Sequence, residues 1–279
     1  MPAAVVPVMI GVAVANDESM SFVAVEWMPR ALLALVVSLA LQVGVNYAND
    51  YSDGVRGTDD DRAGPMRLVA SRRATARAVK TAAFAALGVA CVAGLALAAL
   101  TTWWLVALGV LCVLAAWTYT GGPRPYGYAG WGEVFVFVFF GLVATVGTTY
   151  VIVEAVSTLA VLSGVLAGLL AVALLMVNNI RDIEGDSRSG KRTLAVRLGA
   201  ARSKNLFVLV YAAAFVVVIA ASTQSLGALL GVAGLLAALP AISTVREATT
   251  APRLIAALGM TARTQLVVGL CYAVGLVIH

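Results

Sequence analysis

Charged residues are scarce in this chain. Asp, Glu, Lys and Arg make up 12% of its 279 residues, 61% of the residues are hydrophobic, and the mean hydropathy is +0.95. A soluble domain would carry about a quarter charged residues. This shortage excludes an ordinary soluble domain. The apolar runs are also continuous, whereas the strands of a membrane β-barrel alternate apolar and polar residues. The composition therefore predicts an all-α polytopic membrane protein.

Histidine and cysteine are nearly absent too. The single His279 is the last residue, which excludes a histidine-based metal site. Cys91, Cys112 and Cys271 lie inside apolar runs without the spacing of a metal site, so we interpret them as small core residues. The N-terminus lacks the charged segment and cleavage site of a signal peptide. It opens directly on an apolar run, so we expect either that the first helix is short or that the start of the chain is truncated.

Apolar runs of about 20 residues are long enough to cross a bilayer as helices. On this criterion the chain has about nine spans, which we expect to surround a central cavity in a single domain over 1–279. The domain would consist of two pseudo-related halves, about 1–130 and 131–279. The predicted spans are 2–15, 30–49, 75–100, 103–119, 132–152, 157–179, 203–222, 225–245 and 261–278.

Basic residues predict the orientation of the spans. Nearly all Lys and Arg residues follow the even-numbered spans, and the connections after spans three, five and seven contain none. Cytoplasmic loops carry such an excess of basic residues. We therefore expect a bacterial inner or plasma membrane protein whose N-terminus is inside and whose C-terminus is outside.

Two polar clusters interrupt the apolar pattern, each at the end of a long span and before a basic loop. The first is Asn46-Tyr-Ala-Asn-Asp-Tyr-Ser-Asp53, and the second is Asn178-Asn-Ile-Arg-Asp-Ile-Glu-Gly-Asp186. Their Asn and Asp residues recur at helical spacing, so each cluster forms one face of a helix. Carboxylates so close to hydrocarbon are costly, which indicates a function.

Carboxylate and amide oxygens are ligands that suit Mg²⁺, which is commonly also bound by substrate phosphates. With Mg²⁺ the two clusters could bind a multiply charged anion such as a diphosphate, and the neighbouring Arg and Lys residues would neutralise the remaining charge. Two alternatives stay open. Single acids at a membrane edge can merely cap helices or face water. A cation or proton transporter also pairs intramembrane acids, although its site would be expected at mid-membrane.

The clusters resemble a known family. Asn49-Asp-x-x-Asp53 and Asp182-x-x-x-Asp186 look like the two aspartate motifs of the UbiA-type intramembrane prenyltransferases, and the resemblance covers essentially the whole chain. Within this superfamily the chain is most similar to the 1,4-dihydroxy-2-naphthoate polyprenyltransferases of the MenA type. The stretches that carry this similarity are Pro2-Ala-Ala-Val-Val-Pro7, Asn46–Asp53 with Gly64-Pro-Met-Arg-Leu68, Tyr119-Thr-Gly-Gly-Pro-Arg-Pro-Tyr126, and Asn178–Asp186 with Gly190-Lys-Arg-Thr-Leu194.

The resemblance implies an Mg²⁺-dependent aromatic prenyltransferase of menaquinone biosynthesis. It would transfer a polyprenyl chain from its diphosphate to 1,4-dihydroxy-2-naphthoate, with loss of CO₂, to give a demethylmenaquinol. Asp50, Asp53, Asp182 and Asp186 would be catalytic and, with Asn49, would hold two metal ions. The expected diphosphate-binding residues are Asn46, Arg62, Arg67, Asn178, Lys191 and Arg192, and the expected acceptor-binding residues are Tyr119, Arg124 and Tyr126.

The chain departs from the family pattern at two places. Gly57 stands where the broader family often has a third aspartate, and Asp59, Asp60 and Asp61 follow instead. The basic residues that usually precede the first span are absent. Alternative aromatic substrates, namely 4-hydroxybenzoate, homogentisate or chlorophyllide, would use the same chemistry. A non-catalytic quinone- or lipid-binding membrane protein is a more remote possibility. The sequence indicates neither the prenyl length nor the oligomeric state.

Overall fold

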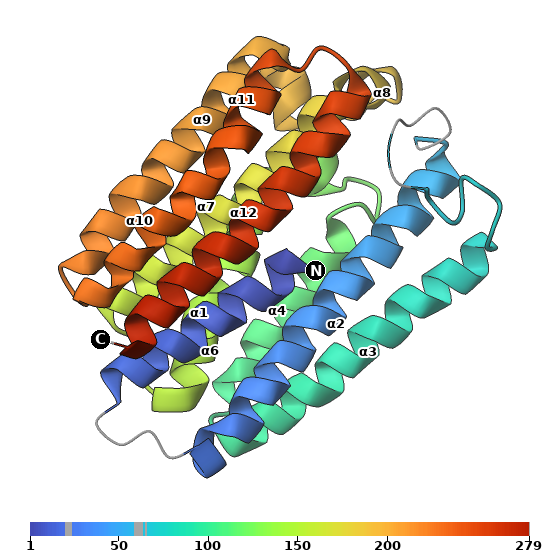
Figure 1. Cartoon of the computed structure of the whole chain (residues 1–279). Helices are drawn as coiled ribbons and strands as arrows, with labels where there is room; N and C mark the ends of the chain where they lie inside the picture. Colours follow the sequence, from blue (N-terminus) through green and yellow to red (C-terminus); the bar gives the residue numbers. More distant parts are fainter. Residues whose placement is uncertain (20–23, 59–63, 65, 279) are drawn as a thin grey trace.

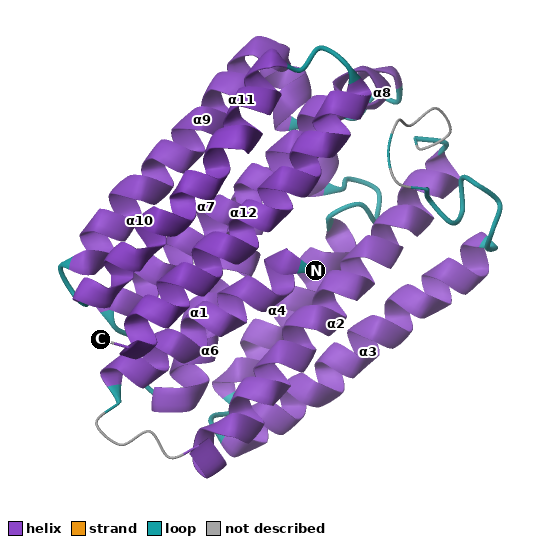
Figure 2. Ribbon diagram, viewed as in Figure 1, coloured by secondary structure: helices purple, strands orange, loops and turns teal. Residues whose placement is uncertain are grey.

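The computed structural model describes residues 1–19, 24–58, 64 and 66–278, and this part of the chain is helical apart from its connections (Figure 2). The main helices are α1 (Pro2–Glu18), α2 (Ala24–Arg56), α3 (Ala76–Leu100), α4 (Trp104–Thr118), α5 (Gly132–Val136), α6 (Ala144–Val153), α7 (Thr158–Arg181), α8 (Ile183–Arg188), α9 (Leu194–Ser222), α10 (Leu230–Leu235), α11 (Leu239–Glu247) and α12 (Ala251–Ile278). Shorter helical pieces join them: η1 (Tyr126–Ala129), η2 (Phe137–Val143), η3 (Leu226–Leu229) and η4 (Leu236–Ala238).

Seven helical segments of the described chain are long and apolar enough to cross a membrane, so the predicted all-helical, multi-pass membrane fold is confirmed. The nine predicted spans each have a helical counterpart. The first and fourth are short, however, with 17 residues in α1 and 15 in α4. The fifth span is α5, η2 and α6 in succession, and the eighth is the series from η3 to α11.

Several helices extend beyond the predicted limits at the end where the basic loops lie. The predicted span at 203–222 begins at Leu194, and the one at 261–278 begins at Ala251. These additional turns carry Arg197, Arg202 and Arg253, which a count of apolar residues leaves out. They continue the helix because arginine is a good helix former. Gly199 departs from helical geometry with φ of 77°, which kinks α9 near its start.

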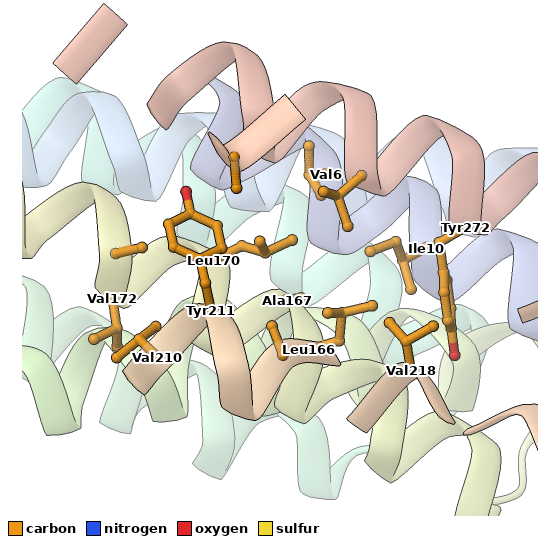
Figure 3. Packing of buried hydrophobic residues seen from close by; sticks show 14 of the residues in the cluster. Val6, Ile10, Leu166, Ala167, Leu170, Val172, Val210, Tyr211, Val218 and Tyr272 are labelled. Atoms are coloured by element: carbon orange, nitrogen blue, oxygen red, sulfur yellow. The ribbon is translucent and has the colours of Figure 1, made fainter. Parts of the chain in front are cut away.

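Helices α1, α7, α9 and α12 share one apolar core (Figure 3). Val6 and Ile10 of α1 pack with Leu166 and Leu170 of α7, and all four side chains are almost fully buried. The hydroxyl groups of Tyr272 and Ser163 lie 2.8 Å apart inside this core and form a hydrogen bond. Such a pairing is needed because an unsatisfied polar group inside a membrane bundle is costly.

The fifth and sixth spans approach each other closely. A Cβ atom added to Gly141 in η2 would lie 2.4 Å from the Cα atom of Gly168 in α7, so this contact requires glycine. The same stretch, Phe137–Val143, is wound as a π-helix. Such segments frequently occur at functional sites, and this one carries Phe139 and Phe140 on a cavity wall.

The C-terminal ends of α2 and α7 lie at the same end of the bundle. Figure 1 shows the α2–α3 connection, α8 and the α11–α12 connection gathered there, whereas the C-terminus lies at the opposite end. The two predicted polar clusters belong to opposite halves of the chain, and they therefore lie at the same end of the molecule.

Candidate active site

The two acidic clusters meet around one lysine. The Nζ atom of Lys191 lies 3.5 Å from Oδ2 of Asp53, near the end of α2, and 3.7 Å from Oδ1 of Asp186, in α8. Both aspartates are buried, with 2% and 6% of their surface exposed. A positive charge thus lies between the two carboxylates that the sequence places 133 residues apart.

A cavity of about 1130 Å³ opens at this meeting point and continues between the helices. Its polar end and its wall include most of the predicted site residues: Asn46, Asn49, Asp53, Arg67, Tyr119, Tyr126, Asn178, Asp182, Asp186 and Lys191. Apolar side chains of α2, α3, α4 and α6 line the remainder, and they include Ala34, Leu97, Leu105 and Val151. The cavity therefore joins a charged mouth to a long apolar interior.

Asp50 does not line the cavity, although it was predicted to bind metal. Its two carboxylate oxygens accept hydrogen bonds from the backbone N–H groups of Leu68 (2.8 Å) and Val69 (3.0 Å) in the α2–α3 connection. Successive helical residues are about 100° apart, so Asn49 and Asp50 point in different directions. Asn46, Asn49 and Asp53 face the cavity, while Asp50 anchors the loop.

Three other predicted residues also lie away from the cavity or outside the described chain. Arg192 and Arg124 are exposed and do not line the cavity. Arg62 lies outside the described residues, as do Asp59, Asp60 and Asp61. Lys191 and Arg192 were predicted to act together, but the Lys191 side chain faces the carboxylates whereas Arg192 is exposed and lies outside the cavity lining.

Asp182 is held by its neighbour. The Arg181 guanidinium donates two hydrogen bonds, from Nε to Oδ1 and from its terminal nitrogen to Oδ2 of Asp182, both at 2.7 Å. Such two-pronged pairs combine charge with a fixed orientation. Gly64 lies against this guanidinium, since a Cβ atom there would be 3.2 Å from Cζ of Arg181. The α2–α3 connection thus reaches α7 at the mouth of the cavity.

Tyr128 links the α4–α5 connection to the first cluster. Its hydroxyl donates to Oδ1 of Asp53, and its ring lies 5.1 Å from both the Arg56 guanidinium carbon and the Lys191 ammonium nitrogen. Arg56 also donates to the carbonyl groups of Thr120 and Gly122. The end of α2, the α4–α5 connection and the α8–α9 connection therefore meet around Asp53.

Burial and the charges at this site shift the pKa values of two side chains, Lys191 and Tyr128. Burial disfavours the charged form of Lys191, but Asp53 and Asp186 outweigh this effect and raise the pKa of Lys191 above its ordinary value. Burial, together with the Asp53 charge, raises the pKa of the Tyr128 hydroxyl. At neutral pH the lysine is therefore a cation and the tyrosine a neutral donor.

Sequence reasoning assigned no site role to several residues that line the cavity. They are Asn179, Arg181, Glu184, Arg188, Phe135, Phe139 and Phe140. Arg181 and Asn179 stand inside the second motif, so the motif itself was a usable signal for them. The phenylalanines of the fifth span gave no signal, because a membrane helix is apolar on every side.

Magnesium is the metal that the family resemblance implies, and the donor set fits it. Asn49 offers a buried Oδ1 atom without a hydrogen-bond partner at the cavity, beside the carboxylates of Asp53, Asp182 and Asp186. These are hard oxygen donors of the kind that Mg²⁺ prefers. Among the described residues no three acids are close enough to form a preassembled metal group. The donors line the same cavity and come from two segments of the chain, the end of α2 and the region of α7 and α8.

The chain belongs to the UbiA prenyltransferase family, whose model matches residues 4–258. It is 46% identical over 273 residues to the 1,4-dihydroxy-2-naphthoate octaprenyltransferase of Mycobacterium tuberculosis, an alignment that covers 98% of this chain and 92% of that protein. Its identity to the enzyme of the same name from Mycobacterium leprae is 48% over 254 residues, which are 91% of this chain and 85% of the relative.

Solved structures share the fold. A UbiA homologue from Aeropyrum pernix, in its apo state, superposes with a TM-score of 0.72 at 17% identity and covers 98% of this chain and 97% of its own. A UbiA homologue from Archaeoglobus fulgidus, bound to DMAPP and Mg²⁺, has a TM-score of 0.63 at 16% identity, with 99% and 96% covered. At these identities the likeness shows a common fold.

Proposed function

We propose that this chain transfers a polyprenyl group from its diphosphate to 1,4-dihydroxy-2-naphthoate, with loss of CO₂, in menaquinone biosynthesis. The observation that carries the proposal is that one cavity joins both acidic helix ends at its mouth and has an apolar interior. This shape matches a donor with a charged diphosphate and a long hydrocarbon tail. The naphthoate substrate is supported by the names of the mycobacterial relatives, which align over almost the whole chain.

The mouth of the cavity would bind the diphosphate. Asn49, Asp53, Asp182 and Asp186 provide the oxygens for Mg²⁺, which when bound would neutralise the diphosphate and stabilise it as a leaving group. Lys191 and Arg67 line the same mouth and supply positive charge. Asp50 would hold the α2–α3 connection in place through its hydrogen bonds to the N–H groups of Leu68 and Val69.

The reaction needs no external proton acceptor. The allylic C–O bond breaks and the electron pair leaves with the diphosphate. The ring carbon that bears the carboxylate attacks the allyl cation, its bond to the carboxyl carbon breaks, and CO₂ leaves while these electrons restore the aromatic ring. The residues of the chain position the two substrates and exclude water, which would otherwise capture the cation.

The flat substrate would lie against the aromatic wall of the cavity. The rings of Tyr126 and Phe135 stack with their centroids 3.8 Å apart, and Tyr119 lies 5.4 Å from Tyr126. These side chains line the cavity near the polar mouth. An aromatic ring placed there would gain stacking contacts next to the allylic carbon.

We also propose that the mouth faces the cytoplasm of a bacterial cell. The connections at this end carry the basic residues, whereas Arg30 stands at the opposite end, paired with Glu154 at 2.9 Å. By the positive-inside rule the basic end is cytoplasmic, so the C-terminus lies outside.

An assay with purified protein in lipid vesicles tests this function. Octaprenyl diphosphate and Mg²⁺ would be supplied with 1,4-dihydroxy-2-naphthoate, 4-hydroxybenzoate or homogentisate in separate reactions. We expect prenylated product and one CO₂ per product with the naphthoate, and at least about tenfold less turnover with the others. Turnover of 4-hydroxybenzoate at the rate of the naphthoate would contradict the proposed substrate.

A further inference from the structure

Glu133 is a buried acid that belongs to neither aspartate motif. It stands in the first turn of α5 with 7% of its surface exposed, and it does not line the cavity. The sequence offers a simple interpretation, because an acid is stabilised at the N-terminal end of a helix by the helix dipole. Its side chain, however, does not turn to solvent. It contacts α7, 46 positions further along the chain.

The contact fixes the orientation of an amide. Nδ2 of Asn179 donates to Oε1 of Glu133 at 2.8 Å, and Asn179 lines the cavity whereas Glu133 does not. A carboxylate can only accept hydrogen bonds, so the amide nitrogen of Asn179 must point toward it. The carbonyl oxygen of Asn179 is therefore the polar atom that this residue offers to the cavity.

The surroundings of Asn179 suit a flat aromatic ring with a hydroxyl group. Tyr119, Tyr126 and Phe135 line the same cavity. Tyr119 is adjacent to α5, because a Cβ atom on Gly132 would lie 3.6 Å from the Tyr119 hydroxyl oxygen. Asn178, the neighbour of Asn179, faces the cavity as well, at the end that carries Asp182 and Asp186. The Asn179 oxygen is thus placed between the aromatic wall and the diphosphate site.

We propose that Glu133 is a positioning residue that aims the Asn179 carbonyl oxygen at a ring hydroxyl of the aromatic substrate. The hydroxyl remote from the carboxylate is the one available, because the other is hydrogen-bonded to that carboxylate within the substrate. An acceptor at this hydroxyl holds the ring in one orientation, with its carboxylate-bearing carbon toward the allylic carbon. The inference rests on the proposed function and specifies the recognition of its aromatic substrate.

Three variants separate this role from the helix-dipole role. Glu133→Gln can donate as well as accept, so it no longer fixes the amide of Asn179. Glu133→Asp keeps the negative charge in the first turn of the helix but is one methylene too short for the contact. Asn179→Leu removes the oxygen at similar volume. For all three we expect KM for 1,4-dihydroxy-2-naphthoate to rise about tenfold, because the loss of one hydrogen bond weakens binding by about that factor. KM for octaprenyl diphosphate should change less than twofold.

The analogue 1-hydroxy-2-naphthoate, which lacks the remote hydroxyl, distinguishes this role from a merely structural one. Its inhibition constant should be the same, within twofold, in the wild type and the three variants. An equal weakening of both naphthoates, or a normal KM in Glu133→Asp, would overturn the proposal. So would a larger change in the KM for the diphosphate or in the Mg²⁺ requirement, since Asn179 would then serve the metal site. Failure of the wild type to prenylate 1,4-dihydroxy-2-naphthoate would instead refute the proposed function.

Discussion

The ammonium group of Lys191 lies 3.5 Å from the Asp53 carboxylate, although 138 positions separate the two residues in the chain. Asp186 approaches the same ammonium from the other side at 3.7 Å. Three charged groups from α2, α8 and the loop after α8 thereby meet at the mouth of one cavity. This arrangement joins the two acidic motifs into a single site.

The two acids on either side of Lys191 should be equally necessary. Asp53→Ala and Asp186→Ala are each expected to lower prenyl transfer at least about 100-fold, because each removes an oxygen ligand of the Mg²⁺ that would stabilise the leaving diphosphate. Turnover per folded protein, measured in vesicles, checks this expectation. Glu154→Gln is the matched control, since this acid pairs with Arg30 at the opposite end of the bundle and should leave activity unchanged. Near-normal activity in either aspartate variant would remove that residue from the site.

Lys191 and Arg192 are adjacent in sequence but should differ in function. Lys191→Ala removes a cation from the cavity mouth and is expected to raise KM for the prenyl diphosphate at least about tenfold, as the loss of a charge-assisted contact does. Arg192→Ala alters an exposed side chain outside the cavity and should change KM less than twofold. Steady-state kinetics with varied diphosphate separate the two variants. Equal effects would mean that the loop changes its arrangement when the donor binds.

Asp50 should act through the α2–α3 connection. Asp50→Ala leaves the N–H groups of Leu68 and Val69 without their acceptor, which costs about 1–3 kcal/mol of loop stability. Trypsin should therefore cleave after Arg72 or Arg73 faster in Asp50→Ala than in the wild type, whereas Asp53→Ala should be cleaved at the wild-type rate. An unchanged cleavage rate in Asp50→Ala would show that the loop does not depend on this carboxylate.

The apolar end of the cavity should limit the length of the donor tail. Gly109 of α4 lines the cavity, and no atom lies within 4 Å of the position that its Cβ would take. It stands five residues from Trp104, so it is about 7–8 Å from the end of α4 remote from the acids. Gly109→Leu should therefore lower turnover of octaprenyl diphosphate several-fold more than that of geranyl diphosphate.

The control for this test is Gly88→Leu in α3. Gly88 also has no atom within 4 Å of its Cβ position, but it does not line the cavity. Leucine is a better helix former than glycine, so neither substitution should destabilise its helix. In Gly88→Leu the ratio of octaprenyl diphosphate turnover to geranyl diphosphate turnover should equal that of the wild type. A Gly109→Leu enzyme with the wild-type ratio would show that the tail leaves the cavity before it reaches α4.

The polar stripes of α2 and α7 could be predicted from the sequence because helical spacing alone decides which residues share a face. Asn46, Asn49 and Asp53 line the cavity as expected, and so do Asn178 and Asp182, whereas Asp50, which was assigned to the same face, does not. The apolar runs predicted the membrane-spanning helices because bilayer thickness sets the length of a span, and the charge pattern predicted their orientation.

Loop residues and contacts between distant helices could not be predicted in this way. Arg124 and Arg192 stand beside the right motifs, but the direction of a side chain in a loop depends on backbone angles that sequence spacing does not give. The pairing of Asp50 with Leu68 and Val69, and of Glu133 with Asn179, depends on how helices and loops pack. Such contacts arise from tertiary structure and leave no periodic pattern.

In this account both acidic motifs form one magnesium-dependent diphosphate site. The most direct measurement is equilibrium binding of farnesyl thiodiphosphate, an unreactive donor analogue, by the protein in vesicles with and without EDTA. We predict that binding requires Mg²⁺ and weakens at least about tenfold in both Asp53→Ala and Asp186→Ala. Binding that is unchanged by EDTA, or that depends on only one of the two aspartates, would contradict the claim.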